Sequence, residues 1–407
     1  MAHLGRGIAV IGAGYAGMAA AVALAERGVR VVIFESGPVP GGRARRVSSQ
    51  GTELDNGQHI LIGAYTELYR MMGTVGVQHD ALLRMPLEIR YTARFYFRRL
   101  WLPEPFGLAG GLLTARGISF FERLGAARFI AGLHRNHFHV ADDMPVSELL
   151  ARNGQDGSIA HYLWRPLCVS ALNTPPELAS ANVFLAVLRD TLGGKTEASD
   201  LLLPRVDLSR LFPEPAADYV RAHGGEIRLQ SPVKELGALR QSFDHVIVAV
   251  GPHQLKTLLP DAPEYSYQPI YTCYLQYAAG VRLPVPMLGL ADGLVQWVFD
   301  RGALLGEKGR LACVISAQGD HQQMSLDEIA ERCQRELAAA LPGIGKPKWS
   351  RVIAEKRATI TCSPGVKTLP SRMDGVSFAG DYTDPEYPPT LEAAVRSGIR
   401  ATQAING

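Results

Sequence analysis

The stretch IAVIGAGYAGMAAAVALAERGVRVVIFE, residues 8–35, decides the fold of this 407-residue chain. Its first apolar residues, 8–11, predict a strand that runs into a glycine-rich turn. An alanine-rich helix follows, and we expect it to end at Gly28, because glycine readily adopts the left-handed conformation that ends helices. A second apolar strand over residues 29–34 leads to Glu35. Strand, glycine turn, helix and acid-terminated strand together make up a dinucleotide-binding βαβ unit.

The three glycines of the turn have different predicted roles. Gly12 permits the tight turn, Gly14 lets the backbone approach a pyrophosphate, and Gly17 lets the helix pack near the strand. The N-terminus of the helix offers free N–H groups and a partial positive charge to the phosphates. Glu35 stands where a carboxylate accepts hydrogen bonds from a ribose diol. The same carboxylate would repel a 2′-phosphate, which disfavours NADP.

Further segments extend the predicted cofactor site. Arg43 follows a glycine pair and can grip a phosphate with its forked guanidinium. Residues 55–59, DNGQH, open a new apolar stretch. Near the C-terminus, a short strand ends in Gly380 and Asp381, and a helix beginning near residue 390 points its N-terminus back toward them. A strand end and a helix N-terminus that face each other form a site for an anion or a dipole.

The composition of the chain indicates its general class and its expected number of domains. A hydrophobic fraction of 47% and a charged fraction of 20% are typical of a globular chain with an ample core, and 407 residues predict two domains. The net charge of +3 is too small to indicate a nucleic-acid partner. Five scattered cysteines without C-x-x-C spacing favour a reducing, cytoplasmic compartment. No apolar run is long enough to predict a transmembrane helix.

In this order, the glycine motif, the acid, Gly-Gly-Arg and the D-x-G-x-H segment resemble the FAD-dependent amine oxidase and phytoene desaturase superfamily. The resemblance implies FAD as the cofactor. It implies an α/β fold in which a discontinuous, Rossmann-like FAD-binding domain carries an inserted α+β substrate domain. The FAD-binding domain is then expected at residues 1–80, 205–262 and 350–407, and the substrate domain at residues 81–204 and 263–349.

The resemblance also implies which residues contact FAD. It places the 380–381 pair near the phosphate and ribityl chain. The helix after residue 390 would lie at the flavin N1/O2 edge, where its dipole stabilises the negative charge of reduced flavin. The full predicted set is Gly12, Gly14, Gly17, Glu35, Gly42, Arg43, Gly57, Gln58, His59, Val233 (through its backbone, at the adenine), Gly380, Asp381, Leu391, Glu392 and Ala393. No metal ligand is predicted.

Longer segments, among them ALNTPPELASANVFLAVLRDTL at residues 171–192 and FAGDYTDPEYPPTLEAAVRSG at residues 378–398, narrow the resemblance. They are similar to the squalene-associated FAD-dependent desaturases, now called hydroxysqualene dehydroxylases. The resemblance implies a reduction in hopanoid synthesis, in which reduced flavin gives hydride to an allylic carbon of hydroxysqualene, water leaves and squalene forms. A carotenoid-type desaturase, an amine oxidase and a flavin-binding protein without activity remain alternatives on the same fold.

Three residues are candidates for the chemistry. A general acid must protonate the hydroxyl, because hydroxide is a poor leaving group. His59 is a candidate for that acid, although a residue at this place more often positions the flavin. Aromatic faces stabilise an allylic cation without offering a nucleophile, which makes Tyr274 and Trp297 candidates. Strand alternation places Tyr271 and Tyr277 on the opposite face from Tyr274.

A C30 substrate is hardly soluble in water and must come from a bilayer. Residues 93–135 mix apolar side chains with arginines, and form either a helix pair with a basic solvated face or a membrane-surface patch. We therefore expect peripheral contact with the inner face of the cytoplasmic membrane, an isoprenoid substrate, no nucleic acid and an electron donor that the sequence leaves unassigned. His134, His137 and His139 are closely spaced, but no carboxylate or cysteine completes a metal-binding set.

Overall fold

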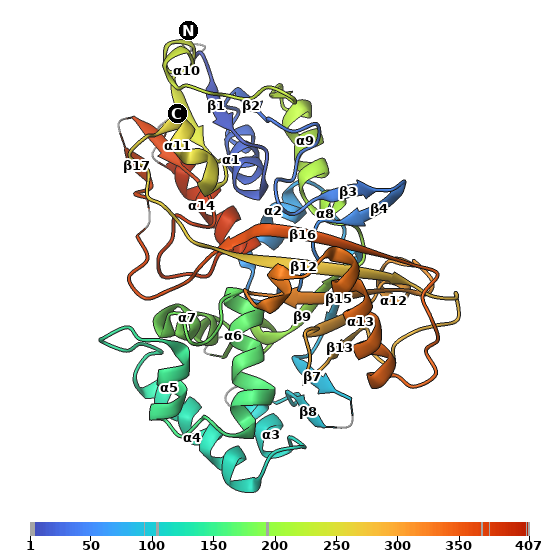
Figure 1. Cartoon of the computed structure of the whole chain (residues 1–407). Coiled ribbons are helices and arrows are strands. Elements are labelled where there is room, and N and C mark those ends of the chain that lie inside the picture. Colours follow the sequence, from blue (N-terminus) through green and yellow to red (C-terminus); the bar gives the residue numbers. More distant parts are fainter. Residues whose placement is uncertain are drawn as a thin grey trace.

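The computed structural model describes residues 5–92, 94–102, 106–192, 195–367, 369–373, 375–403 and 405. The chain folds into two lobes, each built on one large sheet, and both chain termini lie on the first lobe (Figure 1). This arrangement confirms the predicted α/β fold with an inserted second lobe.

The first sheet contains the βαβ unit. Its central strand β1 (Ile8–Ile11) pairs in parallel with β2 (Val31–Phe34) and β11 (His245–Val248). The order across the sheet is β10 (Glu226–Arg228), β2, β1, β11, β18 (Val376–Phe378) and β17 (Arg372–Met373), with only β17 antiparallel to its neighbour. The second strand begins two residues later than predicted, because the Val29 N–H still bonds to the Leu24 carbonyl of the preceding helix.

Three helices pack against this sheet. α1 (Tyr15–Glu26) is buried except for its last residue and packs on α14 (Leu391–Gln403) and α9 (Pro213–Ala222). Gly28 has φ +70° just beyond the end of α1, as predicted. Gly398 lets α14 approach α1 closely, since a Cβ there would lie 2.1 Å from the Ala16 carbonyl oxygen. The packing of these two helices therefore depends on the lack of a side chain at this position.

The second sheet builds the other lobe. Its order is β16 (Trp349–Ile360), β12 (Tyr267–Gln276), β15 (Arg310–Ser316), β14 (Trp297–Asp300), β13 (Met287–Gly289), β7 (Glu88–Tyr91) and β8 (Phe95–Arg98). The predicted domain boundary at residue 350 needs correction, because β16 pairs with β12 along nearly its whole length. The last segment of the FAD-binding lobe thus begins after Ile360.

The two faces of the second sheet have different partners. α13 (Leu326–Ala340) covers one face, where it packs against Tyr271 and Tyr277. Tyr274 belongs to the core on the other face, so the predicted alternation is confirmed. A capping box begins α13, since Ser325 and Glu328 bond reciprocally at 3.2 and 2.7 Å, as the S-x-x-E spacing of the sequence predicts.

Helices of the insert cover the face that carries Tyr274. They are α3 (Phe106–Leu113), α4 (Phe120–Arg135), α5 (Val146–Arg152), a π-helical turn (Ala160–Trp164), α6 (Arg165–Leu172) and α7 (Ala181–Leu192). Pro175 and Pro176 lie before the last of these helices and do not begin it. α7 begins at residue 181, and the Ser180 hydroxyl caps it by accepting the Val183 N–H at 3.1 Å.

The remaining helices and strands lie outside the two large sheets and the helices already described. They are α2 (Thr66–Thr74), α8 (Leu208–Leu211), α10 (Gly237–Ser242), α11 (Leu255–Leu258), α12 (Arg301–Leu305), the hairpin β3 (Arg46–Ser49) and β4 (Thr52–Asp55), and a small sheet of β5 (Leu61–Ile62), β9 (Leu201–Pro204) and β6 (Leu82–Met85). All five cysteines are buried free thiols. Within the described ranges, no helix is both long and apolar enough to cross a membrane.

The α1–α14 contact generates a prediction. Gly398→Ala should destabilise the fold by about 1–3 kcal/mol, because the added methyl group forces two packed helices apart. Gly132→Ala is a matched control in α4, where a Cβ would meet no atom within 4 Å. The control should gain up to about 1 kcal/mol from helix propensity. Thermal unfolding of the FAD-bound proteins measures both, and equal midpoints for the two variants would contradict this account.

Candidate functional site

A cavity of about 790 Å³ lies between the two lobes. Twelve of the predicted cofactor-binding residues line it: Gly12, Gly14, Glu35, Gly42, Arg43, Gly57, Gln58, His59, Val233, Gly380, Asp381 and Leu391. Gly17, Glu392 and Ala393 lie outside its lining. The cavity volume is within the range of small-molecule sites, near its upper end, which suits a long ligand.

The glycine turn has the geometry of a phosphate cradle. Gly12 has φ +102°, and a Cβ there would lie 2.5 Å from the Ala249 carbonyl oxygen. A Cβ on Gly17 would lie 2.0 Å from the Gly12 carbonyl oxygen, so Gly17 serves close packing inside the turn. Gly14 is open on the cavity side, where the nearest atom to a Cβ would be the Gly42 Cα at 3.9 Å. A ligand phosphate has room to approach the backbone there.

Glu35 ties the end of β2 to the glycine turn. One carboxylate oxygen accepts the Ala13 N–H at 2.7 Å, and the other accepts the Gly37 N–H at 2.7 Å. The carboxylate therefore has a fixed orientation at the cavity wall near Val233. Its free acceptor positions are available to the hydroxyl groups of a ribose, as the sequence predicts.

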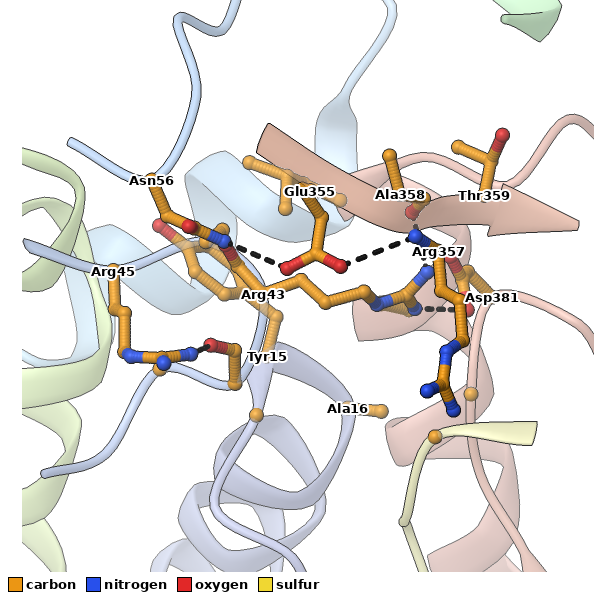
Figure 2. A pocket seen from close by; sticks show the side chains of 18 of the residues that line it. Tyr15, Ala16, Arg43, Arg45, Asn56, Glu355, Arg357, Ala358, Thr359 and Asp381 are labelled. Atoms are coloured by element: carbon orange, nitrogen blue, oxygen red, sulfur yellow. Dashed lines mark hydrogen bonds and ion pairs between the residues drawn. The ribbon is translucent and has the colours of Figure 1, made fainter. Parts of the chain in front are cut away.

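Arg43 acts as a clamp that the sequence did not anticipate. Its guanidinium donates to the Ala358 carbonyl and to the Asp381 carboxylate, each at 2.6 Å (Figure 2). Burial lowers the pKa of Arg43 and the Asp381 carboxylate raises it, with a net rise. The side chain thus fastens the loop after β2 to β16 and to the C-terminal strand end. Two of its donors are committed to protein partners, so a phosphate would meet a guanidinium already held in place.

Glu355 extends this polar wall from β16. Its carboxylate accepts from the Asn56 side-chain amide at 3.0 Å and from the Arg357 N–H at 3.2 Å (Figure 2). The same Asn56 amide donates to the Arg43 carbonyl at 2.8 Å. Sequence reasoning missed this group, because residues on β16 become part of the cavity only when the second sheet is folded against the first lobe.

Below the cavity floor lies a buried ion network. Arg301, which is 1% exposed, donates to the Asp55 carboxylate at 2.9 Å and to Gln58 at 3.2 Å. Two further N–H groups of Arg301 donate hydrogen bonds to the Glu307 carboxylate at 2.6 and 3.0 Å. The other oxygen of Asp55 accepts the Leu208 N–H at 2.9 Å. These bonds hold the predicted D-x-G-x-H segment against the second lobe.

The structure corrects the role of Tyr274. Its hydroxyl donates to the Asp55 carbonyl at 2.8 Å, and its ring lies 5.3 Å from the Arg301 guanidinium. Burial raises the pKa of this hydroxyl. The side chain is fully buried outside the cavity lining, so Tyr274 supports the ion network and does not face a ligand. Trp297, in contrast, lines the cavity wall.

His59 lines the cavity as a neutral side chain. Burial lowers its pKa, and its Nδ1 lies 3.1 Å from the Gly57 carbonyl. This contact places the proton on Nδ1, which leaves Nε2 as a hydrogen-bond acceptor. A neutral imidazole whose single N–H already forms a hydrogen bond to a backbone carbonyl is poorly suited to protonate a leaving group. The geometry favours the positioning role that the sequence analysis set beside the acid role.

The N-terminus of α14 reaches the cavity differently than predicted. The Glu392 carboxylate is fully buried and points away, where it accepts the N–H groups of Glu67 and Leu68 at 3.1 and 2.8 Å. It therefore caps α2. Thr390, which the prediction missed, caps α14 by accepting the Ala393 N–H at 3.2 Å and lines the cavity. A threonine before the first helical turn is a sequence signal that could have identified it.

A second, apolar cavity of about 140 Å³ meets the first. Its walls come mainly from apolar side chains of β7, β8, α3, α4, α6 and α7, and the two cavities share Ile60, Tyr65, Ser170, Ala171, Trp297 and Thr390. At this junction, the Trp297 indole N–H donates to the Ser170 hydroxyl at 3.0 Å. Away from the junction the lining is mainly apolar, with Glu88, Thr191, Ser199 and Tyr387 as its polar residues.

In the ranges that the structure describes, no three histidine, cysteine or carboxylate side chains converge as possible metal ligands. His134, His137 and His139 are exposed. The ring of His134 instead packs edge-on against Phe138, with 4.8 Å between the centroids.

Comparisons with known proteins agree with this site. The family model described as flavin containing amine oxidoreductase matches residues 15–406. The hydroxysqualene dehydroxylase of Zymomonas mobilis is 28% identical over 96% of this chain and 97% of its own length. That of Sinorhizobium fredii is 27% identical over 97% of both chains. The zeta-carotene desaturase of Synechocystis is 23% identical over 98% of this chain and 96% of its own.

Solved structures show the same fold. An oxidoreductase from Methanosarcina mazei superposes with a TM-score of 0.73 at 14% identity, covering 98% of this chain and 99% of that chain. The cyclohexylamine oxidase of Brevibacterium oxydans superposes with a TM-score of 0.67 at 18% identity, covering 98% of both chains. The lining residues fit FAD. The glycine turn leaves room for a phosphate, Glu35 has a fixed orientation, and the N-terminus of α14 lines the same cavity.

Arg43 can be tested through its clamp. Arg43→Met keeps the length of the side chain but leaves the buried Asp381 without its partner. We expect at least tenfold weaker FAD binding and a lower thermal midpoint, because the cavity wall loses its cross-link. Titration of the apoprotein with FAD measures the affinity. Adding Asp381→Asn to the variant should recover part of the stability, and a double variant as unstable as the single one would speak against an ion-pair clamp.

His59 generates a pH prediction. Burial lowers its pKa below the ordinary value of 6.5, so the unfolded chain binds the proton first as the pH falls. The stability from neutral His59 is complete above pH 6.5 and is lost as the pH falls toward the lower pKa of the folded state. Below pH 6.5, the thermal midpoint of the wild type should therefore fall more steeply with decreasing pH than that of His59→Gln. The surface variant His79→Gln should follow the wild type, and parallel curves for all three would refute the assignment.

Proposed function

Since this chain belongs to the flavin containing amine oxidoreductase family and is an FAD-dependent oxidoreductase, we propose that it removes the hydroxyl group of hydroxysqualene reductively and releases squalene. The observation that carries the proposal is the junction of an apolar cavity with the cofactor cavity at the N-terminus of α14. The relatives named hydroxysqualene dehydroxylase, which align over nearly the whole chain, support the same substrate.

The apolar cavity suits a hydrocarbon chain. Most of its lining is aliphatic or aromatic, and the one carboxylate in it, Glu88, is paired with Arg90 at 3.2 Å. A charged amine would lose its hydration there without gaining an unpaired counter-ion, which disfavours an amine oxidase. A carotenoid-type desaturase has the same need for an apolar cavity. The product of the reaction distinguishes the two.

The polar groups at the junction can hold the substrate hydroxyl. Ser170 accepts from the Trp297 indole, so its own O–H is directed to another acceptor. Tyr65 bonds to Thr390, and burial raises the pKa of Tyr65, which keeps its phenol protonated. Two hydroxyl groups that line the same junction would bind the oxygen atom of an allylic alcohol and polarise its C–O bond.

The reaction balances as alcohol plus hydride plus proton giving hydrocarbon plus water. When bound, reduced FAD supplies the hydride. The junction hydroxyls would donate hydrogen bonds to the departing oxygen as it takes up the proton, and the Trp297 ring, which lines the junction, would stabilise the positive charge that develops on the carbon. The apolar walls exclude bulk water, which would otherwise capture the cation and restore an alcohol.

An anaerobic single turnover tests the proposal. The protein is reduced, mixed with hydroxysqualene in detergent, and followed by flavin absorbance while the lipid is analysed. We expect flavin reoxidation with one squalene formed for each flavin. If the reduced protein stays reduced, and the oxidised protein is instead bleached by a polyene or an amine, the enzyme works in the oxidative direction and the proposal fails.

Ser170→Ala tests the junction. The variant should turn over at least about tenfold more slowly, because it removes a hydroxyl donor from the leaving oxygen. FAD binding should be unchanged. Thr191→Val is the matched control, since Thr191 also lines the apolar cavity but donates its hydroxyl to the Val187 carbonyl of its own helix at 2.8 Å. Equal losses in both variants would indicate general damage to the cavity and no specific role for Ser170.

A further inference from the structure

One end of the second lobe exposes a cluster of large apolar side chains. Six side chains form this cluster, which we call the apolar tip: Trp101, Leu102, Phe106, Leu113, Phe120 and Phe121. Trp101 and Phe121 are 75% and 82% exposed, and the rings of Phe120 and Phe121 pack on each other with centroids 6.1 Å apart. The other large apolar side chains that are exposed in the described ranges, Val39, Leu178 and Leu326, lie on separate elements. Contiguous exposed apolar surface marks a binding site.

The apolar tip is the outer side of the cavity wall. Leu108 and Leu112 of α3 line the apolar cavity, as does Ile130 of α4. Phe106 and Leu113 of the same α3 are exposed. The wall between the substrate cavity and the surroundings is therefore one helix thick at this place, and it is apolar on both sides.

Exposed basic side chains lie in the same stretch of chain as the apolar tip. Residues 98–135 hold six arginines and two glutamates. Of these arginines, Arg98, Arg116, Arg128 and Arg135 are exposed. Arg123 has an internal role, since its guanidinium donates to the Leu113 and Ile118 carbonyls, each at 3.2 Å. A segment that exposes both large apolar and basic side chains complements a surface with anionic groups above an apolar interior.

We propose that the apolar tip docks on an anionic lipid bilayer, with Trp101, Phe120 and Phe121 inserted among the acyl chains and the exposed arginines of the same stretch among the headgroups. α3 then lies at the boundary between the bilayer and the apolar cavity. A lipid-soluble substrate could pass this one-helix wall without crossing bulk water. The docking is inferred from the exposed side chains alone, whereas the entry route for the substrate also rests on the proposed function.

A bilayer explains these features better than a protein partner. The insertable side chains come from two segments, the bend at Trp101 and the first turn of α4. A fluid layer of acyl chains accepts such side chains without a surface of matching shape. The apolar tip lies at the opposite end of the molecule from β1 and both chain termini (Figure 1). Docking there leaves the cofactor lobe facing water, where an electron donor can reach it.

Vesicle binding tests the proposal without any substrate. The FAD-bound protein is sedimented with phosphatidylcholine vesicles that contain or lack phosphatidylglycerol. We expect binding that requires the anionic lipid and weakens with salt. The double variant Phe120→Ser/Phe121→Ser should bind at least tenfold more weakly. The double variant Leu178→Ser/Leu326→Ser is the control, because it removes exposed apolar side chains elsewhere and should bind like the wild type.

Trp101 supplies a direct signal. Its fluorescence should shift to the blue on vesicle addition, and Trp101→Phe should abolish the shift while the protein still sediments. The proposal is overturned if the wild type ignores anionic vesicles, if both double variants bind equally, or if light scattering shows that the apolar tip joins two copies of the chain. The double variant at the tip should keep full activity on detergent-dissolved substrate. Vesicle binding by a protein that never forms squalene would leave the docking intact and refute the proposed function.

Discussion

The buried charge of Arg301 is the constraint on which the two-lobed structure depends. A guanidinium that is 1% exposed is tolerable only if carboxylates neutralise it and hydrogen bonds satisfy its donors. Asp55 supplies this from the first lobe and Glu307 from the second. Because these partners lie far apart in the sequence, the charge is satisfied only when both lobes are in place. The network thereby fixes the segment 55–59 at the wall of the cofactor cavity.

Two other charged groups are held in a similar way, Arg43 at the cavity wall and Glu392 behind it. Arg43 joins Asp381 and the Ala358 carbonyl, so three chain segments meet at one guanidinium. Glu392 caps α2 from the first turn of α14. Each of these groups is held by hydrogen bonds to partners remote in the sequence. The walls of the cofactor cavity are consequently rigid before a ligand arrives, which lowers the ordering cost of binding.

Polarity falls along the path from the cofactor cavity to the end of the second lobe. The cradle near Gly14 is made of backbone N–H groups and charged side chains, the junction at Ser170 of hydroxyls, and the further cavity mainly of apolar side chains. The apolar tip continues this gradient on the outside of α3. A flavin needs the first environment and an isoprenoid chain needs the last. The hydroxyl groups at the junction are where the two chemistries meet.

The sequence by itself determined the elements whose signals are local. The βαβ unit, the left-handed Gly28, the capping box at Ser325 and the alternation around Tyr274 all follow from spacing within a few residues. The cofactor-lining glycines could be predicted for the same reason, since backbone geometry at a tight turn excludes other residues.

Only the tertiary structure decided which side chains face the cavity. Glu392 stands in the first turn of α14, yet its carboxylate turns to α2, because the N-terminus of that helix offers unpaired N–H groups nearby. Tyr274 lies on the cavity side of its sheet, yet its hydroxyl goes to the Asp55 carbonyl. No local sequence pattern marked Ser170, because its hydrogen-bond partner, the Trp297 indole, lies on a strand more than a hundred residues away. Burial forces each polar group to find a partner, and which partner is close depends on how distant segments pack.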